Sequence, residues 1–373
     1  MDFSVVQKDL NRALSIVARA VPTRSTLPIL NNILVEAGDG CIELTAYDLE
    51  LGIQMNVPAQ VKAQGKMAFP ARHIVDIVGW FGPEQEINFS LDDGNLVRIH
   101  SGQSKFQLNA LTSEDFPLLP EFKEGEFQGF ALDSDVLAGL LKKTVFASGK
   151  DSTRSFTSGI LFNLSADEIK LVATDTRRLS LAVAHQEEPF KTEHSSLVPR
   201  KTMEDLERIL GLGGSDPVEV TLSENLAAFR FMDVFLISRL MDTSFPDYRR
   251  VIPEETKGKA LIKVADLDRA ARAASIMARE KDGRDTVKLE TGEAQLIVSS
   301  NVENLGYSDL KIPAEVEGES LEIAFNYKYL LEPLGHVDTE SIELHYSGSL
   351  DPALFKMPGS DSFVYVLMPV RLH

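Results

Sequence analysis

The sequence is poor in the features that mark disulfide-bonded and membrane-spanning proteins. Its 373 residues contain a single cysteine, Cys41, so an internal disulfide is impossible and a zinc site built on several cysteines is excluded. No apolar run approaches the roughly 18 residues that a membrane span needs, and the N-terminus lacks the basic and apolar regions of a signal peptide. We therefore expect a cytoplasmic protein with no membrane partner, although many secreted proteins also lack disulfides.

Motifs for cofactor binding and catalysis are absent as well. There is no GxxxxGK[ST] or GxGxxG loop, no HExxH pair and no GxSxG elbow. We therefore predict no cofactor, no metal and no catalytic residue. Asp175 in "VATDTRRLS" is the carboxylate in the most notable setting, and Asp48 in "LTAYDLELG" lies 127 residues before it. A residue that recurs at one structural point is more often a turn or cap former than a catalyst.

Positive charge is scarce. The chain has 38 lysines and arginines against 56 aspartates and glutamates, which gives a net charge of −18. This balance argues against a protein that binds nucleic acid over its whole surface. It leaves room for a local basic stripe, because only local neutralisation of phosphates is needed.

What the sequence does contain is a repeat. Apolar residues at three- and four-residue steps predict helices over residues 5–21, 132–148 and 264–280. A second set of helices is predicted over residues 70–82, 199–211 and 326–337. Pro70 and Pro199 suit helix starts, and Asn326 is a good N-cap. The offsets between corresponding helices are 127–130 residues.

Between the helices the pattern changes to period two, which is typical of antiparallel strands. Phe106, Phe235 and Val364 lie 129 residues apart each time and are expected to occupy equivalent strand positions. The chain is therefore predicted to be an α+β protein of three repeated domains, each with two helices and antiparallel sheets. The predicted domains cover residues 1–122, 123–255 and 256–373.

One phrase recurs with a difference. "SEDFPLLP" and "TSFPDYRRVIP" contain Phe-Pro pairs 129 residues apart, at Phe116 and Phe245. Both phenylalanines are expected to fill a core at the end of a repeat. The extra residues from Asp247 to Val251 occur only in the second phrase and indicate a function added there.

The first helices of the repeats are locally basic. Residues 5–21, 134–150 and 264–281 contain about 10 basic and about 5 acidic residues. One interpretation is that these helices line a face that meets a polyanion through phosphate contacts. The other is that they are ordinary solvated helix faces. The charge pattern by itself favours the second interpretation.

Several long phrases resemble one family. They are "RSTLPILNNILVE" at 24–36, "LTAYDLELG" at 44–52, "VATDTRRLSLA" at 172–182, "FPDYRRVIP" at 245–253 and "YVLMPVRL" at 365–372. The chain resembles the bacterial sliding clamp, the beta subunit of DNA polymerase III, over essentially its full length. The resemblance implies a clamp fold that forms a head-to-tail homodimeric ring. Such a ring encircles double-stranded DNA independently of sequence and acts as a non-catalytic processivity factor in DNA replication.

The resemblance also implies a peptide-binding pocket between the second and third domains. It would receive short motifs from the DNA polymerase III alpha subunit, the clamp loader and other clamp-binding proteins. The matching positions are Thr157, Thr174, Thr176, Arg177, Arg178, Leu179, Pro246, Arg250, Val251, Pro352, Val366, Leu367, Met368, Pro369, Val370 and Arg371.

The chain departs from the family pattern at this pocket. Thr176 stands where a glycine is usual, so a positive φ there would be strained. Arg177 replaces a histidine, and Thr157 stands where leucine is frequent. We expect a more polar pocket with an altered peptide preference. His373 extends the usual ending by one residue, and the sequence assigns it no role.

The resemblance further implies DNA contacts and dimer contacts. The DNA-binding positions are Arg24, Lys150, Lys201, Asn326 and Tyr329. The dimer interface would involve Phe106 and Leu108 on one edge and Arg272 and Ile276 on the other. Two alternatives stay open: a clamp-fold interaction scaffold that does not encircle DNA, and an enzyme whose site is assembled between repeats.

Overall fold

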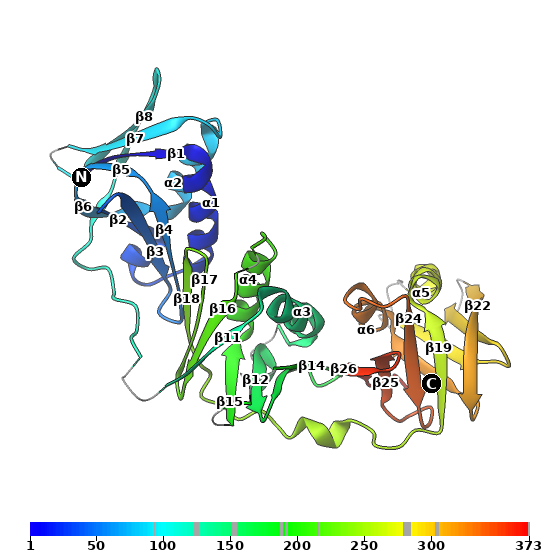
Figure 1. Ribbon diagram of the computed structural model, residues 1–373. Coiled ribbons are helices and arrows are strands. Elements are labelled where there is room, and N and C mark those ends of the chain that lie inside the picture. Colours follow the sequence, from blue (N-terminus) through cyan, green and yellow to red (C-terminus); the bar gives the residue numbers. More distant parts are fainter. Residues whose placement is uncertain are drawn as a thin grey trace. The chain divides into compact units, whose positions relative to one another are not determined.

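The chain forms two compact units. The computed structural model describes residues 1–92, 94–122, 127–150, 155–186, 189–190, 193–214, 216–278, 285–302 and 306–371. One unit contains Met1–Leu137 and Asp205–Leu240, and the other contains Ala138–Glu204 and Met241–His373. The division passes through two helices of the middle repeat, α3 (Ser134–Thr144) and α4 (Arg200–Leu210) (Figure 1). The predicted domain boundaries near residues 122 and 255 stay predictions.

The first unit is built on two antiparallel sheets. In spatial order, the smaller sheet contains β5 (Gln60–Ala63), β1 (Asp2–Val6), β7 (Glu86–Leu91), β8 (Leu96–Ser101) and β9 (Ser104–Asn109). The larger contains β10 (Leu111–Thr112), β6 (Gly65–Pro70), β2 (Asn32–Gly38), β3 (Cys41–Tyr47), β4 (Leu51–Pro58), β18 (Val234–Arg239), β17 (Leu226–Phe231), β16 (Val218–Ser223) and β11 (Phe127–Leu132). Strands from two repeats therefore share one sheet, and they meet where β4 pairs with β18.

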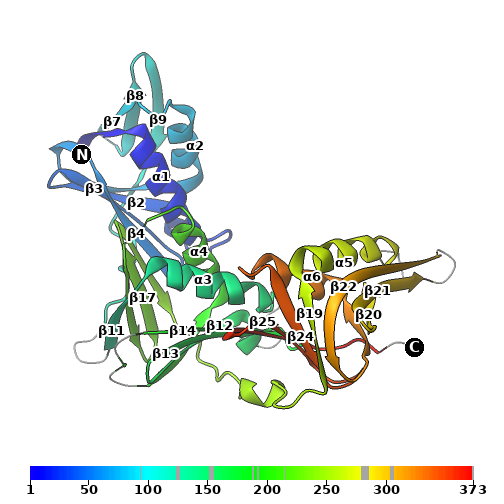
Figure 2. The same cartoon turned by 45° about the vertical axis from the view of Figure 1, so that its right-hand side comes forward.

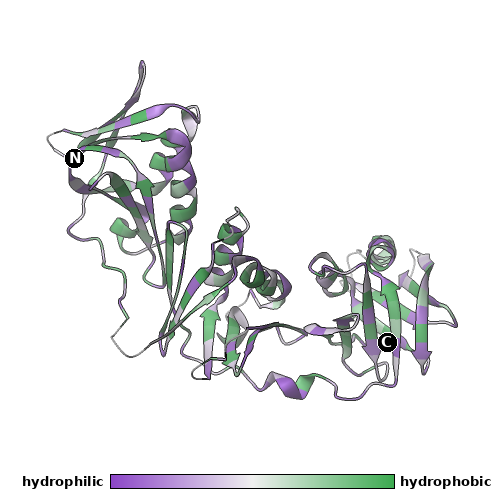
Figure 3. Cartoon of the chain, in the orientation of Figure 1, coloured by the Kyte–Doolittle hydropathy of each residue, from purple (hydrophilic) through white to green (hydrophobic). Residues whose placement is uncertain are grey.

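The second unit has one long antiparallel sheet. Its order is β15 (His194–Pro199), β12 (Gly159–Ser165), β13 (Glu168–Thr174), β14 (Arg178–His185), β26 (Ser360–Leu367), β25 (Ala353–Met357), β24 (Ser341–Tyr346), β19 (Gly258–Lys263), β22 (Gly306–Gly318), β21 (Gln295–Val302), β20 (Thr286–Thr291) and β23 (Glu322–Asn326). Here the two repeats meet where β14 pairs with β26. Along the strands, hydrophobic and hydrophilic residues alternate (Figure 3), as expected for sheets with one face in a core.

The helices confirm the predicted α+β class. The first helices of the repeats are α1 (Gln7–Val17), α3 and α5 (Val264–Ala278); the second are α2 (Ala71–Trp80), α4 and α6 (Tyr327–Leu331). Short 3₁₀ turns are η1 (Ala18–Ala20), η2 (Pro28–Asn31), η3 (Val145–Ala147), η4 (Ser155–Ser158), η5 (Tyr248–Val251) and η6 (Pro333–Gly335). Figure 2 shows α5 and α6 beside the strands of the third repeat.

Helix boundaries differ from the prediction. The first helices α1 and α3 begin later than expected, because Val5, Val6 and Leu132 belong to strands β1 and β11. Pro70 and Pro199 lie one residue before their helices, as the last residues of β6 and β15. The helix after Asn326 is short, because Pro333 lacks an N–H and cannot continue an α-helix. Asn326 is the predicted N-cap, and its side chain accepts a hydrogen bond from the Lys328 N–H at 3.0 Å.

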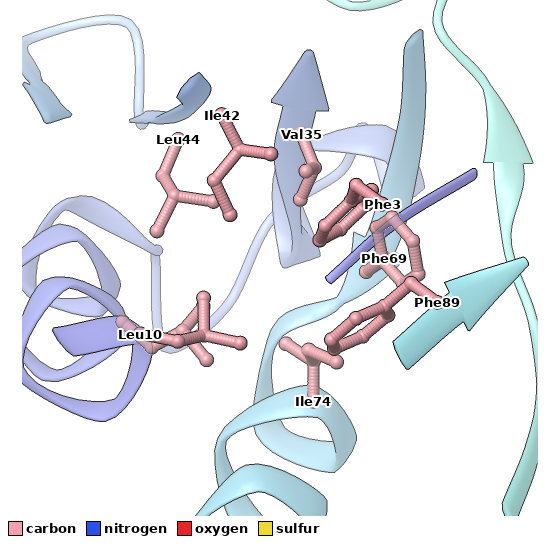
Figure 4. A pocket seen from close by; sticks show the side chains of 9 residues that line it. Phe3, Leu10, Val35, Ile42, Leu44, Phe69, Ile74 and Phe89 are labelled. Carbon is pink, nitrogen blue, oxygen red and sulfur yellow. The ribbon is translucent and has the colours of Figure 1, made fainter. Parts of the chain in front are cut away.

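The core of the first repeat lies between its helices and sheets. Phe3 and Phe89 stack with ring centroids 4.7 Å apart, and Phe69 meets Phe89 edge-on at 6.3 Å. Leu10 from α1 and Ile74 from α2 point toward these rings (Figure 4). Burial of this apolar and aromatic surface holds the helices on the sheets.

The strand equivalence expected for Phe106 is wrong by one residue. A two-residue turn joins β8 to β9, where Ser101 pairs with Ser104, and another joins β17 to β18, where Phe231 pairs with Val234. Counted from these turns, the residue equivalent to Phe235 is Lys105. A shift of one residue moves every side chain to the opposite face of a sheet, so spacing alone assigned Phe106 to the wrong face.

The repeated aspartates form turns, as predicted. Asp48 Oδ1 accepts hydrogen bonds from the N–H groups of Glu50 and Leu51, at 3.0 and 2.7 Å. Asp175 Oδ1 accepts from Arg177 and Arg178 in the same way, at 2.9 and 3.1 Å. The residue after each aspartate has a positive φ, 77° at Leu49 and 76° at Thr176. The backbone predicted to be strained at Thr176 is therefore present in both repeats.

Replacing Thr176 with glycine should stabilise the chain. A left-handed backbone costs an L-residue about 1–2 kcal/mol, and glycine loses about 0.5–1 kcal/mol through its freer unfolded state. We expect the Thr176→Gly free energy of unfolding to rise by up to about 1.5 kcal/mol, measured by denaturant unfolding. Arg177→Gly is the control, since the φ of Arg177 is not positive, and it should lower stability. A loss of stability in Thr176→Gly would contradict the strain argument.

Candidate functional site

A cavity of about 190 Å³ opens in the second unit where β14 pairs with β26. Its wall combines strand residues with the segment that surrounds η5. The lining residues are Phe156, Thr174, Thr176, Arg178, Leu179, Phe245, Pro246, Asp247, Tyr248, Val251, Val366 and Met368. Most of this wall is apolar. A concave apolar site with a few polar groups is the usual form of a ligand pocket.

The turn at Asp175 fixes one side of the cavity. Thr174 Oγ1 donates to the carbonyl oxygen of Arg178 at 2.6 Å and accepts from the Thr176 N–H at 3.0 Å. The Met368 N–H donates to the carbonyl oxygen of Arg177 at 3.0 Å, which continues the strand pairing past the end of β26. The backbone beside the cavity is therefore held from both strands.

Arg178 is buried, with 7 % of its surface exposed, and each of its three guanidinium nitrogens donates a hydrogen bond. It donates to Asp175 Oδ2 at 3.0 Å, to the Phe146 carbonyl oxygen at 2.8 Å and to Glu332. The guanidinium also lies over the Tyr329 ring, 4.5 Å from its centroid. Burial lowers the pKa of Arg178, but Tyr365, Glu332 and Asp175 together raise it above its ordinary value. A buried cation with this many partners within the protein has a structural role in the wall and is not left unpaired for a ligand.

The structure gathers half of the predicted pocket residues around the cavity. Those that line it are Thr174, Thr176, Arg178, Leu179, Pro246, Val251, Val366 and Met368. The other predicted residues are not among its lining: Thr157, Arg177, Arg250, Pro352, Leu367, Pro369, Val370 and Arg371. Leu367 is buried in the core of the third repeat, on the opposite face of β26.

Sequence reasoning missed Phe156 and Phe245 as lining residues, and it assigned Asp247 and Tyr248 to a phrase with an added function without naming them as pocket positions. Phe156 and Phe245 meet edge-on, with ring centroids 6.0 Å apart, so Phe245 forms pocket wall and does not only fill a core. Asp247 and Tyr248 belong to the extra residues of the second Phe-Pro phrase, which was a usable signal. Phe156 lies in η4, and no sequence pattern marked it.

Three exposed arginines lie near this cavity without being part of its lining. They are Arg177, Arg249 and Arg250. Asp247 is 3.3 Å from Arg250 and 3.8 Å from Arg249. Ion pairs this exposed contribute little stability, so these cations can also meet groups of a ligand.

The predicted DNA residues occupy varied settings. Arg24 and Lys150 are exposed in loops, and Lys201 is exposed in the first turn of α4. Asn326 caps α6. Tyr329 is half-buried beneath Arg178.

The basic residues of the first helices are more neutralised than the sequence predicts. Lys142 and Lys143 each lie 3.0 Å from Asp338, and Arg19 lies 3.3 Å from Asp205. These aspartates lie outside the helical windows, so the local excess charge is smaller than counted. Arg272 pairs with Asp268 at 2.7 Å within α5. Arg279 and Lys281 lie outside the described residues, as does His373.

The predicted dimer residues lie on exposed edges. Phe106 and Leu108 are half-buried on β9, the last strand of its sheet. Trp80, which the sequence reasoning missed, is 63 % exposed and packs edge-on against Phe106 at 5.6 Å. Ile276 on α5 is 65 % exposed.

The described parts of the chain contain neither a cluster of metal-ligating side chains nor a membrane-spanning helix. Within them, histidine, cysteine, aspartate and glutamate side chains form no group of three or more that could hold a metal ion. The helices found in the same residues are too short or too polar to cross a membrane.

Comparisons with known proteins give one consistent answer. Family models of the DNA polymerase III beta subunit match in chain order: the N-terminal domain at residues 1–120, the central domain at 131–247 and the C-terminal domain at 249–371. The beta sliding clamp of Synechococcus elongatus is 30 % identical over 98 % of both chains. That of Bacillus subtilis is 29 % identical over 100 % of both.

Solved structures agree with the sequence matches. A crystal structure of the Bacillus subtilis DNA polymerase sliding clamp is similar over 100 % of both chains, with a TM-score of 0.94 and 27 % identity. A sliding clamp from Bartonella birtlesii bound to griselimycin gives a TM-score of 0.94 at 32 % identity, again over 100 % of both chains. Because the family models together cover almost the whole sequence, the chain belongs to the family of the bacterial DNA polymerase III beta subunit.

Proposed function

We propose that the chain is a DNA sliding clamp. Two copies join head to tail in a ring that encircles duplex DNA and tethers the replicative polymerase. The protein is a non-catalytic processivity factor that needs no cofactor and works in the cytoplasm. Family membership supports this function, and one structural observation carries it. Successive repeats join by pairing a strand of one repeat with a strand of the next. The corresponding strands at the two outer ends, β9 and the first half of β22, each have one edge that pairs with no described strand.

The two internal joints have the same register. At the first joint Gln54 of β4 pairs with Phe235 of β18, and at the second Leu181 of β14 pairs with Val364 of β26. The spacing from Gln54 to Leu181 is 127 residues, and that from Phe235 to Val364 is 129 residues, in line with the repeat. The joint is therefore a repeated structural unit.

A third joint of this kind needs a second copy of the chain. Equivalent residues in the three repeats are found by following the paired residues from strand to strand, starting two residues before Pro70, Pro199 or Asn326. This leads to Gln54 in the first repeat and to Leu181 in the second. In the third repeat it leads to Asp309. Asp309 lies in the first half of β22, whose described pairing is with β21 alone. The residue equivalent to Phe235 is Lys105 on the edge strand β9. The shared register thus pairs Lys105 of one copy with Asp309 of the other.

The chemistry of these edges suits the pairing. Lys105 and Asp309 are exposed and oppositely charged, and opposite charges directly across two strands stabilise antiparallel pairing. Tyr307, two residues before Asp309, is 76 % exposed. Trp80, Phe106 and Leu108 on one edge and Ile276 on the other would lose apolar surface to water in this joint, which favours association.

The DNA contacts are proposed to be sequence-independent. Arg24, Lys150, Lys201, Asn326 and Tyr329 would meet phosphates, which position a duplex without reading its bases. A ring holds DNA by topology and needs little affinity. The net charge of −18 and the neutralised helix lysines keep that affinity low, so the ring can slide.

The cavity in the second unit is the proposed peptide pocket. Its apolar wall, which includes Leu179, Val366 and Met368, fits the apolar side chains of short linear motifs. The partners would be the polymerase alpha subunit, the clamp loader and other clamp-motif proteins. Arg177, Arg250 and Arg371 would anchor polar or acidic groups that flank those side chains.

The strand register gives a charge-reversal test of dimerisation. Lys105→Glu and Asp309→Lys each place like charges across the joint and should raise the dimer dissociation constant by roughly three- to tenfold. The double variant restores opposite charges and should recover most of the affinity. Sedimentation measures the constant, and the fluorescence of Trp80, the single tryptophan, reports the same step. Lys62→Glu, on an exposed residue of β5, is the control; a double variant as weak as the two losses combined would contradict the register.

Retention on DNA tests the ring itself. Loaded protein should stay on circular duplex DNA and leave when the circle is cut, because a ring slides off a free end. Arg24→Ala together with Lys150→Ala should reduce loading and processive synthesis. Equal retention on circular and linear DNA would favour a scaffold that does not encircle DNA, and intrinsic nuclease or hydrolase activity would favour an enzyme.

Peptide titration tests the pocket. Arg177→His removes a permanent cation, so peptides with an acidic residue beside their apolar anchors should bind more weakly to the variant than to the wild type. The difference should shrink at high salt, because exposed charges are screened. Neutral peptides are the control. Identical affinities for acidic and neutral peptides in both proteins would remove Arg177 from the site.

A further inference from the structure

We propose that the first joint contains a second peptide site, which the chain's own segment from Phe116 to Phe122 occupies. This inference rests on the proposed function, because it uses the second-unit cavity as the template of a peptide site. The segment follows β10 and leads toward β11 as an extended trace (Figure 1).

The two joints are equivalent at the positions that form the cavity. Leu179 pairs with Val366 across the second joint, and both line the cavity. Their counterparts Gly52 and Ile237 pair across the first joint in the same register. Thr174, another lining residue, pairs with Leu179 on the next ladder, and its counterpart Tyr47 pairs with Gly52.

The segment that begins at the Phe-Pro pair supplies the remaining wall in both joints. Phe245 lines the cavity of the second joint, and Phe116, 129 residues earlier, is buried at the first. The same construction therefore exists twice: a Phe-Pro segment packs on the face of two paired strands.

In the first joint this construction is filled by Leu119. Its side chain packs against two apolar clusters, and among the described residues Leu119 is the one that packs against both. One cluster contains Leu34, Tyr47, Ala68 and Phe116, and the other contains Leu226, Ala228 and Ile237. Phe122, three residues after Leu119, packs against the second cluster. A leucine and, three residues later, an aromatic side chain thus pack on the face of the paired strands.

Gly52 makes room for this occupant. A Cβ at position 52 would overlap the Leu119 side chain and would stand 3.2 Å from the Ile237 side chain. The second joint has Leu179 at the equivalent place and Tyr248 in place of Leu119, and there the cavity of about 190 Å³ is left open. The pair Gly52–Leu119 therefore decides that the first joint is closed.

The occupant identifies the class of ligand. An extended peptide that presents a leucine-like side chain and, three residues on, an aromatic one would fit the first joint once its own segment leaves. Leu118, which lies beside Leu119 in the sequence, is 85 % exposed. The segment is therefore held by every third side chain, at Phe116, Leu119 and Phe122, and not along its whole length.

The experiment counts peptide sites on the full chain. The probe is a synthetic peptide with the sequence of residues 114–122, EDFPLLPEF, that carries a photo-crosslinker at its N-terminus. Calorimetric titration of Leu119→Ala should give one more bound peptide per chain than wild type. Mass spectrometry should find the additional crosslinks on β4 or β18, and the crosslinks shared with wild type on β14 or β26. Leu118→Ala is the matched control and should keep the wild-type count.

Gly52→Ala provides a second route to the open site. It displaces the Leu119 side chain without removing apolar surface, so it should also add crosslinks on β4 or β18, and circular dichroism verifies that each variant folds. An unchanged count with unchanged crosslinks in folded Leu119→Ala and Gly52→Ala would overturn the inference. That result differs from failure of the proposed pocket, which would appear as wild-type protein without crosslinks on β14 or β26.

Discussion

The structure depends on one strand pairing that is made twice. The last strand of a repeat, β18 or β26, pairs with the fourth strand of the repeat before it, β4 or β14, in a fixed register. Ile53 faces Leu236 and Ser180 faces Tyr365. Backbone hydrogen bonds set the spacing, and the side-chain period of two decides which residues face the core. Because the register is constant, every other equivalence between repeats follows from it, including the turns at Asp48 and Asp175, the Phe-Pro segments and the free edges.

The same joint carries different chemistry in its two copies. At the first, Gly52 and Leu119 complete an apolar contact within the chain. At the second, Leu179 and Tyr248 join a larger buried cluster, and a cavity remains beside them. A few side chains thus change a sealed joint into an open one without altering the backbone register. In a repeat protein the fold can therefore be kept while one copy of a joint gains an open cavity.

Much of this could be predicted from the sequence, because the informative features are local. The recurrence of Asp48 and Asp175, the N-cap at Asn326 and the positive φ expected at Thr176 each depend on one residue and its neighbours. Spacing failed where a single inserted residue mattered: Phe106 and Phe235 are 129 residues apart, yet the hairpin turns align Lys105 with Phe235. The charge of the first helices was also overestimated, because Asp338 and Asp205 reach Lys142, Lys143 and Arg19 from distant parts of the sequence.

Arg178 shows why residue type alone could not assign roles in the pocket. The sequence groups it with Arg177 and Arg250 as a cation near the ligand. In the structure its guanidinium is buried and shared among Asp175, Glu332 and the Phe146 carbonyl oxygen. Removing such a cation from its partners costs more than a ligand carboxylate would return. Arg178 therefore holds β14 to the segments around Phe146 and Glu332, and the exposed arginines around the cavity are the cations that remain accessible to a ligand.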